Sequence, residues 1–192
     1  GEAMKFTTVT VGGLETNCYI LFEEDRGDAV VIDPGDDSAK ILKALGKRTA
    51  AAVLLTHGHF DHTGALHAFA GTPIHIHHLD KVMLTDSHYS FGDMVLDKGK
   101  RPEATNFVKD GDILRVAGME IQVLHTPGHT RGSVCYRVGG VLFTGDTLFP
   151  GDYGRTDLPG GSPEQMRASL RRLLTLHGLR FYPGHGPGSV IQ

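Results

Sequence analysis

The sequence predicts an α+β fold in which two mixed β-sheets pack against each other and helices cover their outer faces. Short apolar or alternating runs that end at glycine or proline indicate strands in both halves of the chain. Each half also contains a segment with helical periodicity. A chain of 192 residues buries about 70% of its unfolded surface when it folds as one domain. We therefore expect a single domain over residues 4–192.

The first half of the chain begins with strands. The first predicted strand ends at Gly12, and the third ends at Pro34. The helix that follows has Ile41 and Leu45 on one face and ends at Gly46. The predicted strands of this half are 5–11, 17–22, 28–33, 50–55 and 73–77, and the predicted helices are 38–45 and 63–70.

The second half starts with the least patterned segment, residues 79–109, where we expect a helix and a mobile covering loop. The clearest helix of the chain begins at Ser162, a serine N-cap that is followed by proline. Its apolar stripe is predicted to be Met166, Leu170, Leu173 and Leu174. The predicted strands of this half are 111–116 and 119–124, which form a hairpin, then 133–138, 141–144 and 180–182.

The charge balance excludes some partners. The formal net charge is −3, which gives no bulk attraction to nucleic acid or to an anionic membrane, so we expect neither as a partner. No apolar run approaches the roughly 18 residues of a membrane-spanning helix, and no signal-peptide pattern is present. Residues 1–3 precede Met4, and we interpret them as a cloning remnant.

The two cysteines, Cys18 and Cys135, fit neither a disulfide framework nor a zinc–thiolate spacing. Each lies in a strand-like apolar run, so we predict two buried thiols. Free thiols are most compatible with a reducing cytoplasm, which is therefore the predicted location.

The most informative segment is the run 56–62, which contains His57, His59, Asp61 and His62. It directly follows a predicted buried strand, and its glycine allows a short loop in which several side chains converge. Imidazole and carboxylate ligands suit zinc, iron or manganese. The run therefore predicts a metal site.

Four further polar residues share one sequence context. His129, Asp146, His185 and Asp33 each follow an apolar strand and lie near a glycine. Loops at strand ends that collect on one rim of two packed sheets are a favourable place for a site. The additional histidines and aspartate extend the first cluster to a predicted two-metal site. Asp33 is interpreted instead as a turn-forming residue or as a hydrogen-bond partner of a ligand histidine.

The remaining histidines are predicted not to bind metal. His75, His77 and His78 lie on or beside a predicted strand that offers no partner carboxylate. His125 lies close to the site in sequence, so a supporting contact to a ligand is an alternative for it. The others in this class are His67, His88 and His177.

Taken in order, four motifs resemble those of the metallo-β-lactamase superfamily. They are His-x-His-x-Asp-His at 57–62, Pro-Gly-His-Thr at 127–130, Gly-Asp-Thr at 145–147 and Gly-His-Gly at 184–186. The resemblance extends from the first strands to residue 188. It implies a four-layer αββα sandwich with a metal pair at one edge.

The resemblance also implies how the ligands divide. The first metal would be bound by His57, His59 and His129, the second by Asp61, His62 and His185, and Asp146 would bridge both. A carboxylate can span two metals roughly 3.5 Å apart, whereas a neutral imidazole cannot. The predicted cofactors are two divalent ions, with zinc favoured over iron and manganese. Asp61 and Asp146 are also predicted to be catalytic, because they hold the ions that would generate a bridging hydroxide.

Within the superfamily the chain most resembles the short glyoxalase II-like hydrolases, through the stretch 154–161. This resemblance implies hydrolysis of a small thioester or ester, such as S-lactoylglutathione, in which a thiolate leaves without a strong general acid. Arg155 stands where those enzymes carry a lysine for the glutathione carboxylate, so it is the predicted substrate-binding residue. An ion pair with Asp157 is the alternative for Arg155. Asp157 replaces a tyrosine of that family, which leaves the thiol of the substrate open.

A persulfide dioxygenase with one iron is the rival from another reaction class. That family shares the fold and a similar Gly-Arg-Thr-Asp stretch, and its iron would use only His57, His129 and Asp146. The motif at 184–187 favours the hydrolase. A nuclease and a β-lactamase are less favoured, since superfamily nucleases are longer and the chain has no basic track. The oligomeric state stays open.

Overall fold

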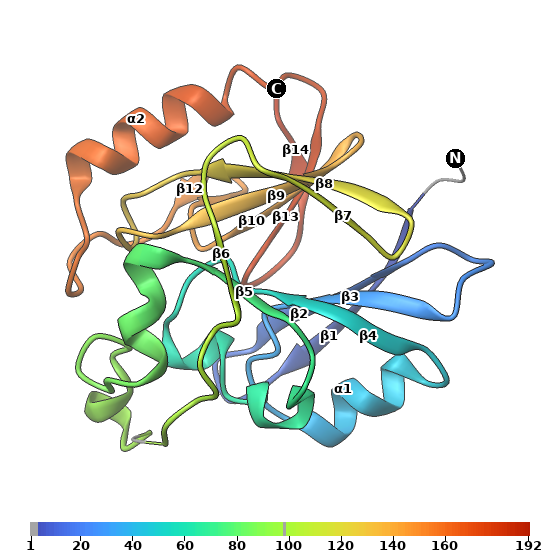
Figure 1. Cartoon of the computed structure of the whole chain (residues 1–192). Helices are drawn as coiled ribbons and strands as arrows, with labels where there is room; N and C mark the ends of the chain where they lie inside the picture. Colours follow the sequence, from blue (N-terminus) through green and yellow to red (C-terminus); the bar gives the residue numbers. More distant parts are fainter. Residues whose placement is uncertain (1–3, 98) are drawn as a thin grey trace.

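The computed structural model of the chain describes residues 4–97 and 99–192. The interpretation of residues 1–3 as a cloning remnant therefore lies outside the described residues. Two six-stranded sheets stack on each other, and a two-stranded ribbon of β11 (Leu148–Phe149) and β12 (Asp152–Tyr153) accompanies them. Figure 1 shows the two sheets with α2 above one and α1 below the other.

The first sheet is mixed and has the strand order β1-β2-β3-β4-β5-β6. The strand β2 runs antiparallel to both of its neighbours, β1 and β3, and β3 to β6 run parallel to one another. The strands are β1 (Lys5–Val11), β2 (Thr16–Phe22), β3 (Asp28–Ile32), β4 (Thr49–Leu54), β5 (Ile74–His77) and β6 (Asn106–Val108).

The second sheet is also mixed and has the order β14-β13-β10-β9-β8-β7. The pair β10 and β13 is parallel, and the other neighbouring strands are antiparallel. The strands are β7 (Ile113–Val116), β8 (Met119–His125), β9 (Val134–Val138), β10 (Val141–Gly145), β13 (Arg180–Pro183) and β14 (Ser189–Val190).

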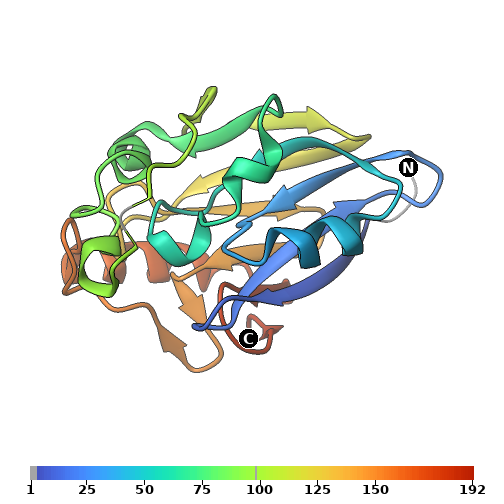
Figure 2. The same cartoon turned by 90° about the horizontal axis from the view of Figure 1, so that it is seen from below.

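Apolar side chains divide into cores on both faces of each sheet. Along β2, Tyr19 and Leu21 belong to the core between the sheets, and Cys18 and Ile20 belong to the outer core. This division follows from the two-residue period of a strand. The helix α1 (Ser38–Leu45) covers the outer core of the first sheet, as Figure 2 shows, and α2 (Pro163–Leu173) covers that of the second. The predicted αββα layering is therefore confirmed.

The prediction of an α-helix over residues 63–70 is wrong. The segment contains the 3₁₀-helix Leu66–Phe69 instead, and another 3₁₀-helix, Phe60–His62, precedes it. The amide of Gly64 donates to the carbonyl oxygen of Gly35 at 2.9 Å, and not to a carbonyl four residues earlier. Within the segment the Ala68 amide donates to the Ala65 carbonyl oxygen at 3.1 Å, three residues earlier, which is the 3₁₀ pattern and not the α-helical one.

The helix expected in residues 79–109 is not an α-helix. The segment contains the 3₁₀-helices His78–Leu84 and Gly92–Val95 and ends with β6. The strand β6 has three residues, which is too short to show an alternating pattern. Arg101 of this segment donates to the carbonyl oxygen of Phe60 at 3.2 Å, so the described part is tied to the loop of the predicted site. The mobility expected of this segment stays a prediction.

The smaller expectations have mixed outcomes. Ser162 caps α2 as predicted, because its hydroxyl accepts from the Gln165 amide at 3.2 Å. Leu174 is 48% exposed and does not belong to the apolar stripe, since α2 ends one residue before it. The two-residue strands β11, β12 and β14 were not predicted. Cys18 and Cys135 are buried free thiols, as predicted.

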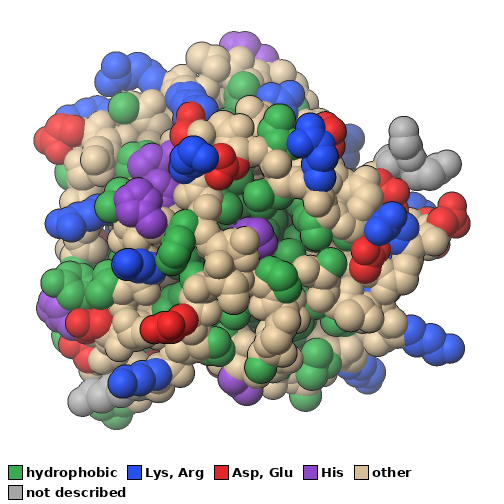
Figure 3. All heavy atoms as spheres, viewed as in Figure 1, with side chains coloured by type: hydrophobic (Ala, Val, Ile, Leu, Met, Phe, Trp, Pro, Cys, Tyr) green, Lys and Arg blue, Asp and Glu red, His purple; other side chains and the backbone are tan. Residues whose placement is uncertain are grey.

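The surface carries charges of both signs, as expected from the 19 basic and 22 acidic residues of the sequence. Figure 3 shows basic and acidic side chains interspersed over the face turned to the viewer. Within the described residues, no helix combines the length and the apolar character that a membrane crossing requires.

Candidate metal centre

The predicted ligands meet at one edge of the sandwich. They lie in loops that follow β4, β8, β10 and β13, and Asp33 directly follows β3. Within the described residues, three overlapping groups have possible ligand atoms within 4.8 Å of one another. The groups are His57, His59 and His129; Asp61, His62, Asp146 and His185; and Asp33, His57 and His62.

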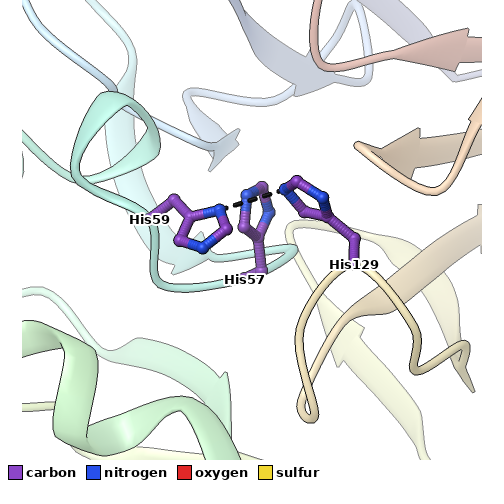
Figure 4. Close-up of side chains that lie close together, drawn as sticks. All are labelled: His57, His59 and His129. Carbon is purple, nitrogen blue, oxygen red and sulfur yellow. Dashed lines mark hydrogen bonds between the residues drawn. The ribbon is translucent and has the colours of Figure 1, made fainter. Parts of the chain in front are cut away.

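The first group consists of three imidazoles, from the loops after β4 and β8 (Figure 4). The ring centroids of His57 and His59 are 4.9 Å apart, and those of His59 and His129 are 4.7 Å apart. The atoms His59 Nδ1 and His129 Nε2 are separated by 3.0 Å. Nitrogen ligands of a tetrahedral zinc ion, with bonds of about 2.0–2.1 Å, lie about 3.3 Å apart. The spacing therefore fits a metal ion held by these nitrogens.

The second group combines imidazole and carboxylate. Asp61 Oδ2 is 3.4 Å from His62 Nε2 and 3.1 Å from His185 Nε2. Asp61 and His62 belong to the 3₁₀-helix after β4, whereas His185 comes from the loop after β13. Residues that lie more than a hundred positions apart thus provide three ligand atoms at one point.

Asp146 lies between the two groups. Its Oδ2 atom is 3.8 Å from His57 Nε2 and 3.5 Å from His129 Nε2. The same oxygen is 3.3 Å from His62 Nε2 and 3.4 Å from His185 Nε2. A carboxylate oxygen that approaches nitrogen atoms of both groups is suitably placed to bridge two ions. The structure therefore brings together all seven residues that the sequence predicted as ligands.

The hydrogen bonding of the buried atoms also fits metal ions. The Nε2 atoms of His57 and His62 are buried and have no hydrogen-bond partner among the described residues. Leaving a buried polar atom unsatisfied costs about 1–3 kcal/mol. A cation bound by these nitrogens would offset that cost.

Two imidazoles of the first group, those of His57 and His59, are neutral at physiological pH. Burial lowers the pKa of His57 well below its ordinary value, and the neighbouring His62 adds to this effect. Burial also lowers the pKa of His59 to about 3, with His129 acting in the same direction. Neutral imidazole is the form that binds a metal, so these nitrogens are available without loss of a proton.

The second group has the opposite electrostatics. Burial opposes protonation of His62, but the carboxylates of Asp146 and Asp61 outweigh it and raise the pKa well above the ordinary value. Burial is likewise outweighed at His185, whose hydrogen bonds to the same two carboxylates raise its pKa to about 10. Without a metal, protons therefore neutralise the carboxylates of this group.

Asp33 supports the ligands as the sequence predicted. Its Oδ2 accepts from His62 Nδ1 at 2.8 Å and from the Thr56 hydroxyl at 2.6 Å. The backbone φ of Asp33 is 54°, the left-handed conformation that aspartate tolerates in turns. Thr56 Oγ1 is in turn 3.0 Å from His57 Nδ1. Asp33 thus orients His62 directly and His57 through Thr56, and both parts of its prediction are confirmed.

The loop of His185 is held by the start of the chain. His185 Nδ1 donates to the Leu14 carbonyl oxygen at 3.0 Å, and the backbone N–H of Asn17 donates to the Gly184 carbonyl oxygen at 2.7 Å. A Cβ atom on Gly184 would lie 2.3 Å from Asp146 Oδ1, so this position requires glycine. The turn between β1 and β2 therefore belongs to the support of the centre.

Arg155 contacts the first group through its backbone. Its carbonyl oxygen accepts from His129 Nδ1 at 2.8 Å. Its guanidinium forms a two-pronged ion pair with Asp157 at 2.6 and 2.9 Å, which is the alternative considered for this residue. The two side chains are 57% and 68% exposed. A contact between Arg155 and a substrate stays a prediction.

Asp80 supports the centre and was missed by the sequence analysis. Its buried carboxylate accepts from the Gly58 amide at 3.1 Å, from the Thr130 hydroxyl at 2.7 Å and from the Gly132 amide at 2.7 Å. It thus ties together the two loops that carry the first group. Its position in a weakly patterned 3₁₀-helix gave no signal that could have revealed it.

The other histidines have separate roles. None of the three ligand groups among the described residues includes His75, His77 or His125. His77 Nδ1 accepts from the Leu79 amide at 3.2 Å, and its ring stacks on His125 at 4.2 Å. His125 Nε2 bonds to the Arg131 carbonyl oxygen at 2.8 Å. His77 is therefore both a strand residue and the cap of a 3₁₀-helix.

The family model of the metallo-beta-lactamase superfamily matches residues 11–185. The chain therefore belongs to the metallo-beta-lactamase superfamily. An uncharacterized protein of Mycobacterium tuberculosis is 39% identical, over 98% of this chain and 93% of the relative. The probable metallo-hydrolase YqgX of Bacillus subtilis is 36% identical, with the same coverage of 98% and 93%. Hydroxyacylglutathione hydrolase GloC of Haemophilus influenzae is 32% identical, again over 98% and 93%.

Solved structures share the fold. The BLEG-1 B3 metallo-beta-lactamase superimposes with a TM-score of 0.92 and 33% identity, over 97% of this chain and 94% of that one. TTHA1623 in a di-iron-bound form superimposes with a TM-score of 0.85 and 37% identity, over 96% of this chain and 94% of that one. ETHE1 from Myxococcus xanthus superimposes with a TM-score of 0.79 and 30% identity, over 97% of this chain and 80% of that one.

These comparisons define the class of protein. Members of this superfamily bind divalent metals, and the two His/Asp groups fit a site for a pair of ions. Of the relatives named above, YqgX is described as a probable metallo-hydrolase and GloC as a hydroxyacylglutathione hydrolase. The di-iron form of one neighbour shows that zinc is not the only metal this fold accepts.

Proposed function

We propose that the protein is a binuclear metal-dependent hydrolase that cleaves small thioesters in the manner of glyoxalase II. The position of Asp146 Oδ2, between 3.3 and 3.8 Å from nitrogens of both ligand groups, carries the proposal. The similarity to GloC, a hydroxyacylglutathione hydrolase, supports a thioester over other substrates. S-lactoylglutathione or a related small thioester is the proposed substrate.

The proposed ligands are those that the motifs and the geometry share. His57, His59 and His129 would hold one ion, Asp61, His62 and His185 would hold the other, and Asp146 would contact both. Two divalent ions supply Lewis acidity when bound, since they polarise a carbonyl oxygen and bring the pKa of water close to neutrality. Zinc is the proposed metal, and iron and manganese are the alternatives.

The chain itself orients and shields this chemistry. Asp33 accepts the Nδ1 proton of His62, which leaves the Nε2 lone pair directed into the centre. The carbonyl oxygen of Arg155 does the same for His129. A thiolate is a good leaving group, so the proposed reaction does not depend on a strong general acid in the protein. Arg155 remains the proposed contact for a substrate carboxylate.

The proposal includes the setting of the reaction. The expected partner is a small-molecule thioester or ester, and neither nucleic acid nor a membrane is proposed as a partner. The two buried free thiols, Cys18 and Cys135, support a reducing cytoplasm as the location.

One sample tests the proposal. Protein from native-like expression is analysed for bound metals, and the same sample is assayed for thioesterase, oxygen-uptake and β-lactamase activity. We expect two metals per chain at full occupancy and thioester hydrolysis without oxygen uptake. A single well-occupied iron together with oxygen uptake would contradict the binuclear hydrolase.

A persulfide dioxygenase is the second candidate. The fold similarity to ETHE1 from Myxococcus xanthus, at 30% identity, is compatible with this reaction as well as with the hydrolase. A single iron would need only His57, His129 and Asp146, and the structure brings these three together as well. Asp61, His62 and His185 do not separate the two candidates, because both families carry these residues. The metal count and the oxygen-uptake assay separate them.

A further inference from the structure

A cavity of about 530 Å³ lies directly beside the candidate metal centre. Asp61 and Thr16 belong to its lining, and Thr16 Oγ1 is 3.5 Å from Asp61 Oδ2. The volume falls in the range of small-molecule pockets, about 300–1,000 Å³. The lining also includes Leu14, Phe60, Val95 and Arg101. A substrate bound at the metals can therefore extend into this cavity.

Three apolar side chains form the walls of the cavity. Leu14 comes from the turn between β1 and β2, Phe60 precedes Asp61, and Val95 ends the 3₁₀-helix Gly92–Val95. Leu14 and Val95 are 56% and 48% exposed, so these walls stay open to solvent in the free protein. Covering them with an apolar ligand group is favourable by roughly 25 cal/mol per Å² of buried surface.

Arg101 is the cationic residue among the described lining residues, and it has no N–H donor left for a ligand. Its Nε donates to the Thr63 hydroxyl at 3.1 Å. Its two Nη atoms donate to both carboxylate oxygens of Asp97 and to the carbonyl oxygens of Gly99 and Phe60, at 2.8–3.2 Å. All five N–H groups of a guanidinium are thus engaged within the protein. Arg101 shapes the cavity but does not offer a site for a carboxylate.

Among the described residues that line the cavity, the remaining charged side chains are negative. Asp97 is neutralised by Arg101, Asp61 belongs to the candidate metal centre, and Asp36 is an exposed carboxylate at the rim. A carboxylate or phosphate at the end of the cavity away from the metals would lose hydration without gaining a cationic partner among the described lining residues. The described lining away from the metals therefore disfavours anionic groups.

We infer that this cavity receives the acyl part of the substrate, and that the preferred acyl group is an uncharged alkyl chain. The inference rests on the proposed thioesterase function and names its substrate class. Glutathione and coenzyme A, the common thiols that carry acyl groups, are anionic, so the thiol part is the less suitable occupant. A chain of several carbons that covers Leu14, Phe60 and Val95 is the matching group.

A series of thioesters of one uncharged thiol, N-acetylcysteamine, tests this inference on the metal-loaded protein. We expect kcat/KM to rise from acetyl to propanoyl to pentanoyl, by about fourfold for each methylene that becomes buried. The glutaryl thioester has the chain length of pentanoyl but ends in a carboxylate, and its kcat/KM should be at least tenfold lower than that of pentanoyl. Equal values for pentanoyl and glutaryl would overturn the inference.

Two lysine variants at neighbouring exposed residues connect the preference to the cavity wall. Val95→Lys places a cation at the rim and should raise the glutaryl-to-pentanoyl ratio at least tenfold. Leu96→Lys adds the same charge at the neighbouring residue, which is 86% exposed and does not belong to the lining, and should leave the ratio unchanged. Both residues are exposed enough for folding to be retained, which the metal content and the Tm of each variant check. A ratio that responds equally to both variants would refute the role of the wall.

A binding measurement separates this inference from the proposed function. Ketone analogues, in which a methylene replaces the sulfur atom, cannot be hydrolysed as thioesters. Calorimetry should show the pentanoyl analogue binding at least tenfold more tightly than the glutaryl analogue. If no thioester is hydrolysed, the proposed function fails, and the ratio of these two affinities still decides the nature of the cavity. Tighter binding of the glutaryl analogue would overturn the inference even if hydrolysis is observed.

Discussion

At the level of single residues, Asp146 determines whether two ions can share this site. Its Oδ2 lies within 3.8 Å of nitrogens from both ligand groups. We predict that Asp146→Ala abolishes thioesterase activity and lowers the occupancy of both metals, because the variant removes the proposed bridge. Metal content per chain and activity on the same sample measure the effect.

His75→Ala is the control for that variant. His75 is half-buried on β5 and lies in none of the described ligand groups. Its replacement should leave the metal content unchanged. If His75→Ala lost a metal while Asp146→Ala kept both, the division of the histidines into ligands and non-ligands would be wrong.

The two ligand groups should also differ in their dependence on pH. The pKa of His59 is lowered to about 3 by burial, so its imidazole is neutral at pH 7. The pKa of His185 is raised to about 10, so its imidazole carries a proton at the same pH. A metal must displace that proton, so we predict that affinity for the second ion rises from about pH 6 to pH 9, whereas affinity for the first changes less.

Calorimetric titration of the metal-free protein with zinc, in buffers of different ionisation enthalpy, counts the released protons. We expect more protons to be released when the second group is filled than when the first is filled. Equal release at both steps would contradict the protonation states of His62 and His185 in the metal-free protein.

At the level of elements, the loop between β12 and α2 connects the first ligand group to the surface. His129 Nδ1 donates to the backbone of Arg155, and the side chain of Arg155 pairs with Asp157. If Arg155 binds a substrate carboxylate, Arg155→Ala should raise KM about tenfold, a loss of about 1–2 kcal/mol, and leave kcat nearly unchanged. The loss should vanish with a neutral thioester.

Asp157→Ala distinguishes this role from loop support. The ion pair with Arg155 is exposed and screened by solvent, so neither variant should unfold the protein. If Arg155 acts only by holding the loop, Asp157→Ala will reproduce its effect, and the loss will be equal for charged and neutral substrates. That outcome would remove Arg155 from the substrate site.

Short elements mark the limit of prediction at this scale. The ranges of β1 and α1 were predicted correctly, because each shows its period over seven or eight residues. The segment 63–70 shows a helical period, yet its Gly64 amide bonds to Gly35 in another loop. A partner so distant in sequence cannot be recognised from local propensity.

At the level of the whole molecule, the metal centre joins both sheets. Its ligands come from loops after β4 in the first sheet and after β8, β10 and β13 in the second. We predict that removal of metal by a chelator lowers Tm. A metal present at a hundred times its Kd contributes about 2.7 kcal/mol, which corresponds to a shift of about 5–10 °C for a chain of this size.

Addition of zinc to the chelated protein should restore the original Tm. The Asp146→Ala variant provides the control, because a protein that binds the metals poorly should respond little to the chelator. An unchanged Tm of the wild-type protein after complete removal of metal would show that the centre does not stabilise the association of the sheets.

The sequence by itself determined the two mixed sheets, their outer helices and all seven candidate ligands. These features are local, since strand periodicity and a polar residue beside glycine at a strand end can be recognised within a few residues. Only the tertiary structure decided which buried groups support the ligands. The carboxylate of Asp80 bonds to Gly58 and Gly132, and the Leu14 carbonyl oxygen holds His185. Such contacts join residues that are distant in the chain, so they arise only once the two sheets have packed together.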